Sequence, residues 1–132
     1  MESENNKRLV QHVYAEVSKG NPAPLLDALA DDVRWTIIGT TAFSGTFHGK
    51  EEALEKLLHP IGARLENGIV FLPERFIAEG DYVVMETRSQ ATTRNGTPYN
   101  NVCCFVLHCQ GGKIREITEY MDTELITRVL GG

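Results

Sequence analysis

Four polar side chains that can take part in acid–base chemistry lie in strand-like segments of the second half of the chain: Arg88, Gln90, Asn101 and Glu119. Arg88 and Gln90 are two positions apart in one segment, Asn101 begins the next, and Glu119 lies in the last. Alternate residues of a strand share one face, so the four converge if those faces point inward. A few polar groups in an otherwise apolar cavity are typical of a small-molecule site.

Glu119 stands between Ile117 and Met121 on one face of its segment. If this face lines a pocket, desolvation makes the charged carboxylate costly unless a cation such as Arg88 pairs with it. The alternative is a solvated ladder of Glu86, Arg88 and Glu119 on the outer face of a sheet. Alternation by itself does not decide between these two interpretations.

Three further side chains also have two interpretations each. Trp35 belongs either to the core or to the wall of a pocket on a half-open sheet. Tyr14, beside the apolar stripe of a helix, lies at the edge of the core or presents a hydroxyl donor. His48, in a loop, is either a surface residue or a catalytic one.

The elements that position these residues follow from the spacing of apolar side chains. Helices are expected over residues 4–19, in a short segment after Pro24 that ends at Asp31 and Asp32, and over residues 50–58, where Pro60 ends the helix. A strand is expected over residues 33–38, followed by a loop or short irregular strands over residues 39–49. Glycine-containing turns then separate the four strands of an antiparallel meander, at residues 69–78, 82–93, 99–109 and 114–122. A final helix is expected over residues 124–130. This order is α+β, with a long curved sheet that three helices close only in part, which leaves a cone or pocket.

Composition narrows the class of protein. The chain has 132 residues, 42% hydrophobic and 23% charged, which predicts one globular domain over residues 1–132. Its net charge of −5 argues against a nucleic acid or an anionic membrane as the partner. The three cysteines are interpreted as buried small side chains in a protein from a reducing compartment. The polar N-terminus lacks the apolar core of a signal peptide. A cytoplasmic protein is therefore expected.

Several motif matches fail on chemistry. The segment 45–50 resembles a phosphate-binding loop but lacks one spacer residue, and Glu51 replaces the residue that would hold magnesium. The four histidines lie far apart without metal-ligand spacing, and there is no Gly-x-Ser-x-Gly elbow. We therefore expect no metal and no cofactor.

The whole chain resembles the nuclear-transport-factor-2-like superfamily, and in particular its SnoaL-like and ketosteroid-isomerase-related branch. The resemblance rests on the helix closed by Lys19-Gly20-Asn21 and on the segments 29–35, 43–50 and 112–122, in that order. It implies a conical α+β fold with a deep apolar pocket, of the cystatin-like or SnoaL-like kind, and a homodimer formed through the outer face of the sheet.

Members of the family use this pocket for several reactions, and the residues of this chain match the catalytic residues of some branches better than those of others. The ketosteroid isomerase positions for tyrosine, base and acid fall near Val13, Ile37 and Cys103 or Cys104, so that mechanism is disfavoured. In the epoxide-hydrolase branch an arginine lies between two acids, and here Arg88 and Glu119 resemble two of the three. Gln90 replaces the other acid and cannot deliver a proton. In the polyketide-cyclase branch, Glu119 with His48 or Tyr14 could enolise an ester.

The function expected from this resemblance is the binding of a small apolar or polycyclic ligand, with cofactor-independent isomerase, hydrolase or cyclase chemistry by general acid–base catalysis. The alternative is a noncatalytic ligand-binding or dimer-scaffold module, and the sequence does not decide whether the protein is an enzyme. The expected catalytic group is Glu119, with Arg88 as its charge partner and Gln90 as an orienting amide. The expected ligand-binding residues are Tyr14, Trp35, Phe43, Phe47, His48, Phe71 and Asn101.

Overall fold

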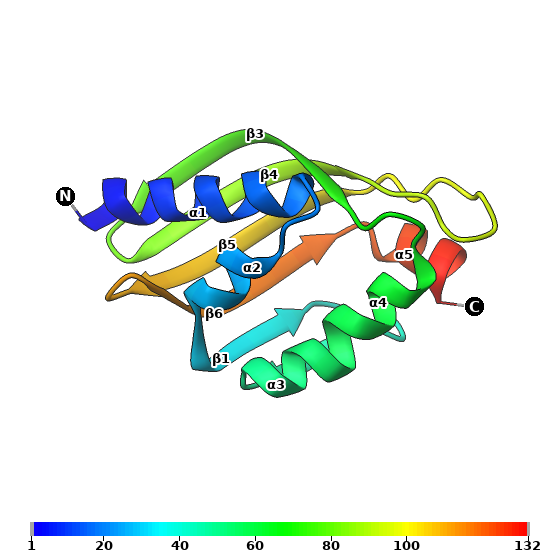
Figure 1. Ribbon diagram of the computed structural model, residues 1–132, viewed down its shortest axis with the longest axis horizontal. Helices are drawn as coiled ribbons and strands as arrows, with labels where there is room; N and C mark the ends of the chain where they lie inside the picture. Colours follow the sequence, from blue (N-terminus) through cyan, green and yellow to red (C-terminus); the bar gives the residue numbers. More distant parts are fainter. Residues whose placement is uncertain (1, 132) are drawn as a thin grey trace.

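A six-stranded sheet in the order β2-β1-β6-β5-β4-β3 dominates the computed structural model, which describes residues 2–131 (Figure 1). β1 (Leu29–Ile37) and β6 (Lys113–Met121) pair in parallel, and the other neighbouring strands are antiparallel. The other strands are β2 (Gly45–His48), β3 (Val70–Glu79), β4 (Tyr82–Gln90) and β5 (Val102–Gln110). The predicted α+β class with a curved mixed sheet is confirmed.

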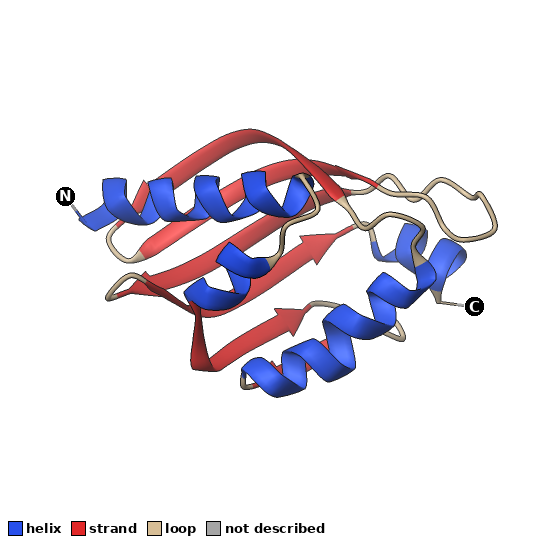
Figure 2. Cartoon of the chain, in the orientation of Figure 1, coloured by secondary structure: helices blue, strands red, loops and turns tan. Residues whose placement is uncertain are grey.

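Figure 2 shows most of the helical segments in front of the sheet and α5 at one end of it. The helical segments are α1 (Glu2–Ser18), α2 (Ala23–Ala28), α3 (Lys50–Ala53), the π-helical η1 (Leu54–Leu58), α4 (His59–Arg64) and α5 (Thr123–Leu130). α1 contacts β3 and β4, and α3 contacts β1. The main apolar core lies between these helices and the inner face of the sheet.

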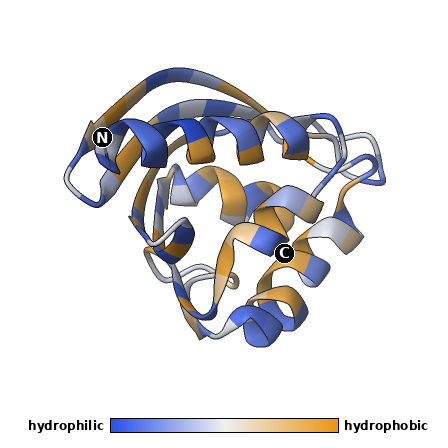
Figure 3. Cartoon of the chain, turned by 60° about the vertical axis from the view of Figure 1, so that its left-hand side comes forward, coloured by the Kyte–Doolittle hydropathy of each residue, from blue (hydrophilic) through white to orange (hydrophobic). Residues whose placement is uncertain are grey.

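The apolar stripe of α1 holds this helix on the sheet. Val10, Val13 and Tyr14 are buried, whereas Gln11 and His12 between them are exposed. This spacing follows the helical period, and Figure 3 shows hydrophobic and hydrophilic stretches alternating along the helices. The stripe therefore turns Tyr14 toward the inner face of the sheet.

Pro60 does not end the third helix, contrary to the sequence prediction. The helical segment continues to Arg64, and Pro60 lies in the first turn of α4. The π-helical turn η1 precedes it, and the backbone N–H of His59 donates to the carbonyl of Leu54. Inside a regular α-helix a proline loses its N–H donor and its ring meets the carbonyl four residues earlier, so Pro60 is accommodated where the wider turn changes the hydrogen-bonding pattern.

The expected boundaries around the first strand were also wrong. The backbone becomes extended at Leu29 (φ −67°, ψ 132°), so residues 29–32 belong to β1 and not to the second helix. The segment 39–49, where a loop or short irregular strands were expected, contains the short strand β2, which pairs with β1 and places Phe47 opposite Trp35. Buried Leu29 and Ala30 gain more in the sheet than they would in a further helical turn on the surface.

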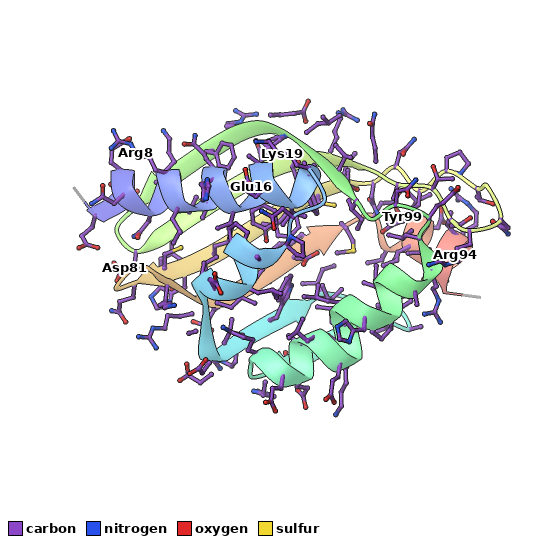
Figure 4. All side chains as sticks on the ribbon, in the orientation of Figure 1. Arg8, Glu16, Lys19, Asp81, Arg94 and Tyr99 are labelled. Carbon is purple, nitrogen blue, oxygen red and sulfur yellow. The ribbon has the colours of Figure 1, made fainter. Side chains whose placement is uncertain are left out.

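A second apolar cluster closes the end of the molecule beside α5. Its buried members are Phe43, Leu65, Tyr99, Ile126 and Leu130. Figure 4 shows Tyr99 and Arg94 at this end, near α4 and α5, whereas Arg8 and Glu16 lie on α1. The Asp122 side chain accepts a hydrogen bond from the Leu125 N–H and begins α5.

Candidate functional site

Glu119 lies on the inner face of β6, between the two strands that flank it. It is opposite Ile37 of β1 and Phe105 of β5. The indole of Trp35 reaches it from the neighbouring position, since Trp35 pairs with Ile117, two residues earlier on the same face. Trp35 Nε1 donates a hydrogen bond of 2.6 Å to Glu119 Oε1. Of the two faces that the sequence left open for Glu119, the structure therefore places it on the inner one.

The surroundings of Glu119 favour its neutral form. Burial raises the pKa of its carboxyl from 4.5 to about 7, and the hydrogen bond from Trp35 opposes this rise only in part. None of the ion pairs found among residues 2–131 includes Glu119. The residue is nonetheless only half-buried, so part of its surface stays accessible to solvent. A carboxyl of this kind can exchange a proton near neutral pH.

Tyr14 brings the second polar group of the site from α1. The side chain is 2% exposed, and its hydroxyl has no hydrogen-bond partner among the residues described. Burial, and next the charge of Glu119, raise the pKa of Tyr14 well above its usual value, so the two groups lie within electrostatic reach. An unpartnered buried hydroxyl is costly, and it is available to a ligand.

Two phenylalanine rings pack against Tyr14, and one of them belongs to the residue opposite Glu119. The Tyr14 ring lies 5.3 Å from those of Phe71 and Phe105, and these two rings are 5.6 Å apart at an interplanar angle of 84°. Such edge-on packing is favourable for aromatic rings. Phe71 was an expected wall residue, whereas Phe105 was not among the expected site residues. Phe105 shares one face of β5 with Cys103 and Leu107, and this run of apolar residues at every second position was the signal that could have identified it.

Arg88 and Gln90 face away from Glu119, and the expectation that they line the site was wrong. The inner positions of β4 are Val83, Met85, Thr87 and Ser89, all of which are buried. The Arg88 side chain is 60% exposed on the outer face, where its Nε lies 3.4 Å from Glu74 Oε2. Both faces of β4 carry apolar residues, so the alternating pattern did not reveal which face is inner.

Asn101 is buried as expected, but its amide is already fully used. Its Nδ2 donates to the Tyr99 hydroxyl (2.9 Å) and to the Asp122 carbonyl (3.3 Å). Its Oδ1 accepts from the backbone N–H groups of Val102 (2.7 Å) and Asp122 (3.1 Å). An amide has two donors and two acceptor positions, so Asn101 has none left for a ligand. It joins the start of β5 to the start of α5.

The three predicted residues of the segment 43–48 do not form one group. Phe43 is buried in the cluster beside α5, with the Arg64 guanidinium 5.0 Å from the centre of its ring. Phe47 packs partly buried against the main core, opposite Trp35. His48 is exposed opposite Arg34, which pairs with Glu116 on the outer face. The structure thus brings together Glu119, Trp35, Tyr14 and Phe71 but leaves His48 outside.

Glu119 lines neither of two hollows that open on the surface of the described residues. One, of about 360 Å³, lies between residues 40–41 and α5 and includes Thr123 and Arg128. The other, of about 370 Å³, is open on the sheet near Arg75, Glu86 and Tyr120. Residues 2–131 contain no cluster of three or more metal-ligating side chains of the His, Cys, Asp and Glu types. No helix in this range is both long and apolar enough to cross a membrane.

Residues 10–117 match the SnoaL-like domain family. The chain belongs to this family. Glu119 lies two residues beyond the matched segment, so the family match does not bear on its role. No protein of curated function matches the sequence.

Solved structures with the same fold cover nearly the whole chain. An NTF2-like protein of unknown function from Burkholderia pseudomallei is 24% identical, with a TM-score of 0.83 over 97% of this chain and 98% of its own. TerC, co-crystallised with polyporic acid, is 23% identical, with a TM-score of 0.82 over 97% and 99%. A putative SnoaL-like polyketide cyclase from Jannaschia is 13% identical, with a TM-score of 0.82 over 99% and 94%. The family match confirms the predicted SnoaL-like membership, and these structural likenesses confirm the predicted fold.

Proposed function

We propose that the protein binds a small, largely apolar ligand in the cone and catalyses a cofactor-independent proton transfer through Glu119. The observation that supports this most is the position of Glu119 on the inner face of the sheet, half-buried and held at 2.6 Å by the Trp35 N–H. In this role, Glu119 takes a proton from the ligand and returns it to another of its atoms. The Tyr14 hydroxyl forms a hydrogen bond with the polar end of the ligand.

The arrangement supports a single-carboxylate proton shuttle better than a hydrolase of the arginine-and-two-acids kind. Hydrolysis of an epoxide in that way needs a cation beside the acids, and Arg88 lies on the opposite face. Isomerisation or cyclisation needs only one group that accepts and returns the proton. The structural relatives named for polyketide cyclase activity and for a complex with polyporic acid are in keeping with a small-molecule site.

Trp35 allows a direct test of this proposal because it is the only tryptophan of the chain. Its indole N–H resonance reports the ionisation of Glu119 and the arrival of a ligand beside it. We expect ligands retained from cells, or members of a library of small ketones and esters, to shift this resonance. Turnover of such a substrate should be lost in Glu119→Gln while binding persists. Unchanged turnover in the variant would remove Glu119 from the mechanism.

The matched control is Glu116→Gln, which changes the same residue type in the same strand but on the outer face. It should leave both turnover and the indole resonance as in the unmodified protein. The noncatalytic ligand-binding module remains the second candidate, and it would retain ligand affinity in every variant without any turnover.

We also propose a homodimer formed through the outer face of the sheet. Among residues 2–131, six large apolar side chains are exposed, and all lie on strands β3 to β6: Val70, Leu72, Ile77, Tyr82, Val102 and Tyr120. The cross-strand pairs place Ile77, Val84 and Val106 in one row. Replacement of Val106 by Lys should convert a dimer to a monomer in light scattering. A monomeric unmodified protein would contradict this proposal. The cytoplasmic location stays a prediction.

A further inference from the structure

The interior of the cone has an acidic group without a basic partner. Every Lys, Arg and His side chain among residues 2–131 keeps at least part of its surface in solvent, and none is buried. The least exposed of these side chains already have acidic neighbours: Lys7 lies next to Glu4, Lys50 next to Asp31 and His108 next to Glu116. Among the residues described, the only side chain that donates to the Glu119 carboxyl is the neutral Trp35 indole. When ionised, it is an uncompensated negative charge in an apolar setting.

Several aromatic side chains lie close to Glu119 on the inner face of the sheet. Trp35 is hydrogen-bonded to the Glu119 carboxyl, and Phe105 lies opposite Glu119 in the neighbouring strand β5. Tyr14 and Phe71 contact Phe105 and each other. Aromatic faces attract cations, and the attraction strengthens when the site is desolvated. The unpartnered Tyr14 hydroxyl adds an oxygen that can accept a hydrogen bond.

We infer that the ligand of this site carries an ammonium-type positive charge, which lies against Glu119 beside Trp35 and the aromatic cluster of Tyr14, Phe105 and Phe71. This inference rests on the proposed binding function, whose ligand class it specifies. An anionic ligand would meet Glu119 without any compensating cation. A neutral ligand would leave the ionised carboxylate as costly as before. A cation both neutralises the carboxylate and uses the aromatic wall.

A bound cation also suits proton transfer. A proton that passes from the cationic ligand to Glu119 leaves a neutral ligand and a neutral carboxylic acid. Neither product carries charge in the apolar interior, so the transfer removes the cost of two buried charges. The reverse step restores the ion pair, and no further reactant is needed.

Glu119 is the group of this site that titrates near neutral pH. From α1, Tyr14 faces it with a pKa raised well above the usual value. From β5 and the segment before it, Cys103 and Tyr99 have pKa values raised to about 12, in each case mainly by burial. These three groups are neutral at pH 6–8. The charge of the site therefore follows Glu119 over this range, and so should its affinity for a cation.

Three probes of nearly equal shape test the inference: choline, its uncharged carbon analogue 3,3-dimethylbutan-1-ol, and the anion 3,3-dimethylbutanoate. Each is titrated at constant ionic strength while the Trp35 indole N–H resonance is followed by NMR. We expect choline to bind about tenfold more tightly than the alcohol at pH 8, and the anion to bind least. Choline affinity should rise between pH 6 and pH 8, whereas that of the alcohol should not.

Two variants assign the effect to one carboxyl. The preference for choline over the alcohol should vanish in Glu119→Gln and persist in Glu116→Gln. If Glu119→Gln fails to fold, the pH dependence of choline binding by the unmodified protein tests the same point. Equal or tighter binding of the alcohol at pH 8 would overturn the cation inference and leave the proposed binding function intact. Absence of any indole shift with all three probes at about 100 mM, well above the weakest affinities expected for such small ligands, would overturn both.

Discussion

Replacement of Glu119 by Gln should change how the stability of the protein depends on pH. Burial raises the pKa of this carboxyl from 4.5 to about 7 in the folded protein. Between these values the native state keeps a proton that the unfolded chain has released. The free energy of unfolding contributed by this group therefore falls as pH rises from about 4.5 to about 7, and is constant above that.

The magnitude follows from the two pKa values. Each pKa unit corresponds to about 1.4 kcal/mol, so the group should cost about 3 kcal/mol of stability above pH 7 relative to pH 4. The amide introduced by Glu119→Gln cannot ionise, and its carbonyl oxygen can still accept the Trp35 N–H. The stability of the variant relative to the unmodified protein should therefore improve by about 3 kcal/mol between pH 4 and pH 8.

Urea unfolding followed by Trp35 fluorescence measures this difference at pH 4, 5, 6, 7 and 8. Protein concentration is held constant, because a dimer would make the apparent stability depend on it. Glu116→Gln, on the outer face of the same strand, should keep the pH slope of the unmodified protein. If Glu119→Gln kept that slope as well, the carboxyl would not be desolvated in the native state. The assignment of Glu119 to an apolar interior would then be refuted.

Four other substitutions have distinct expected outcomes. Trp35→Phe removes the hydrogen bond that lowers the pKa of Glu119, so the midpoint for Glu119 in a carbon-13 NMR titration should rise by about one pH unit. Tyr14→Phe keeps the ring and deletes an unpartnered hydroxyl, so urea unfolding should show unchanged stability or a gain of about 1 kcal/mol; a large loss would reveal a missed partner. Asn101→Ala breaks the bonds that join β5 to α5 and should cost about 2–4 kcal/mol in the same assay. Arg88→Ala breaks one exposed ion pair, so it should cost less than about 1 kcal/mol of stability. It should also leave unchanged the pH midpoint at which the Trp35 indole N–H resonance reports the ionisation of Glu119, and a shifted midpoint would show that Arg88 acts on the Glu119 carboxyl.

Local patterns predicted the elements and one side of the site. The spacing of Val10, Val13 and Tyr14 indicated an amphipathic helix, and the alternation of Ile117, Glu119 and Met121 placed one carboxylate among apolar residues. Both patterns are properties of single elements, which is why the sequence alone was sufficient to find them.

Pairings between distant elements were not accessible in the same way. The hydrogen bond from Trp35 to Glu119 depends on the parallel register of β1 and β6, which no local pattern encodes. The face of Arg88 was ambiguous because Val84 on the outer side is as apolar as Val83 and Met85 on the inner side. The amide of Asn101 looked available until its four hydrogen bonds were known.

The parallel pairing of β1 with β6 has a consequence for biosynthesis. Trp35 and Glu119 are separated by 84 positions in the chain, and β6 occupies the centre of the sheet between β1 and β5. During translation, β1 leaves the ribosome long before its central neighbour exists, and one of its edges stays unpaired until then. Contacts of such large sequence separation form slowly. The site should therefore appear only when β6 is released, so that a nascent chain exposes an open strand edge before Trp35 and Glu119 can meet.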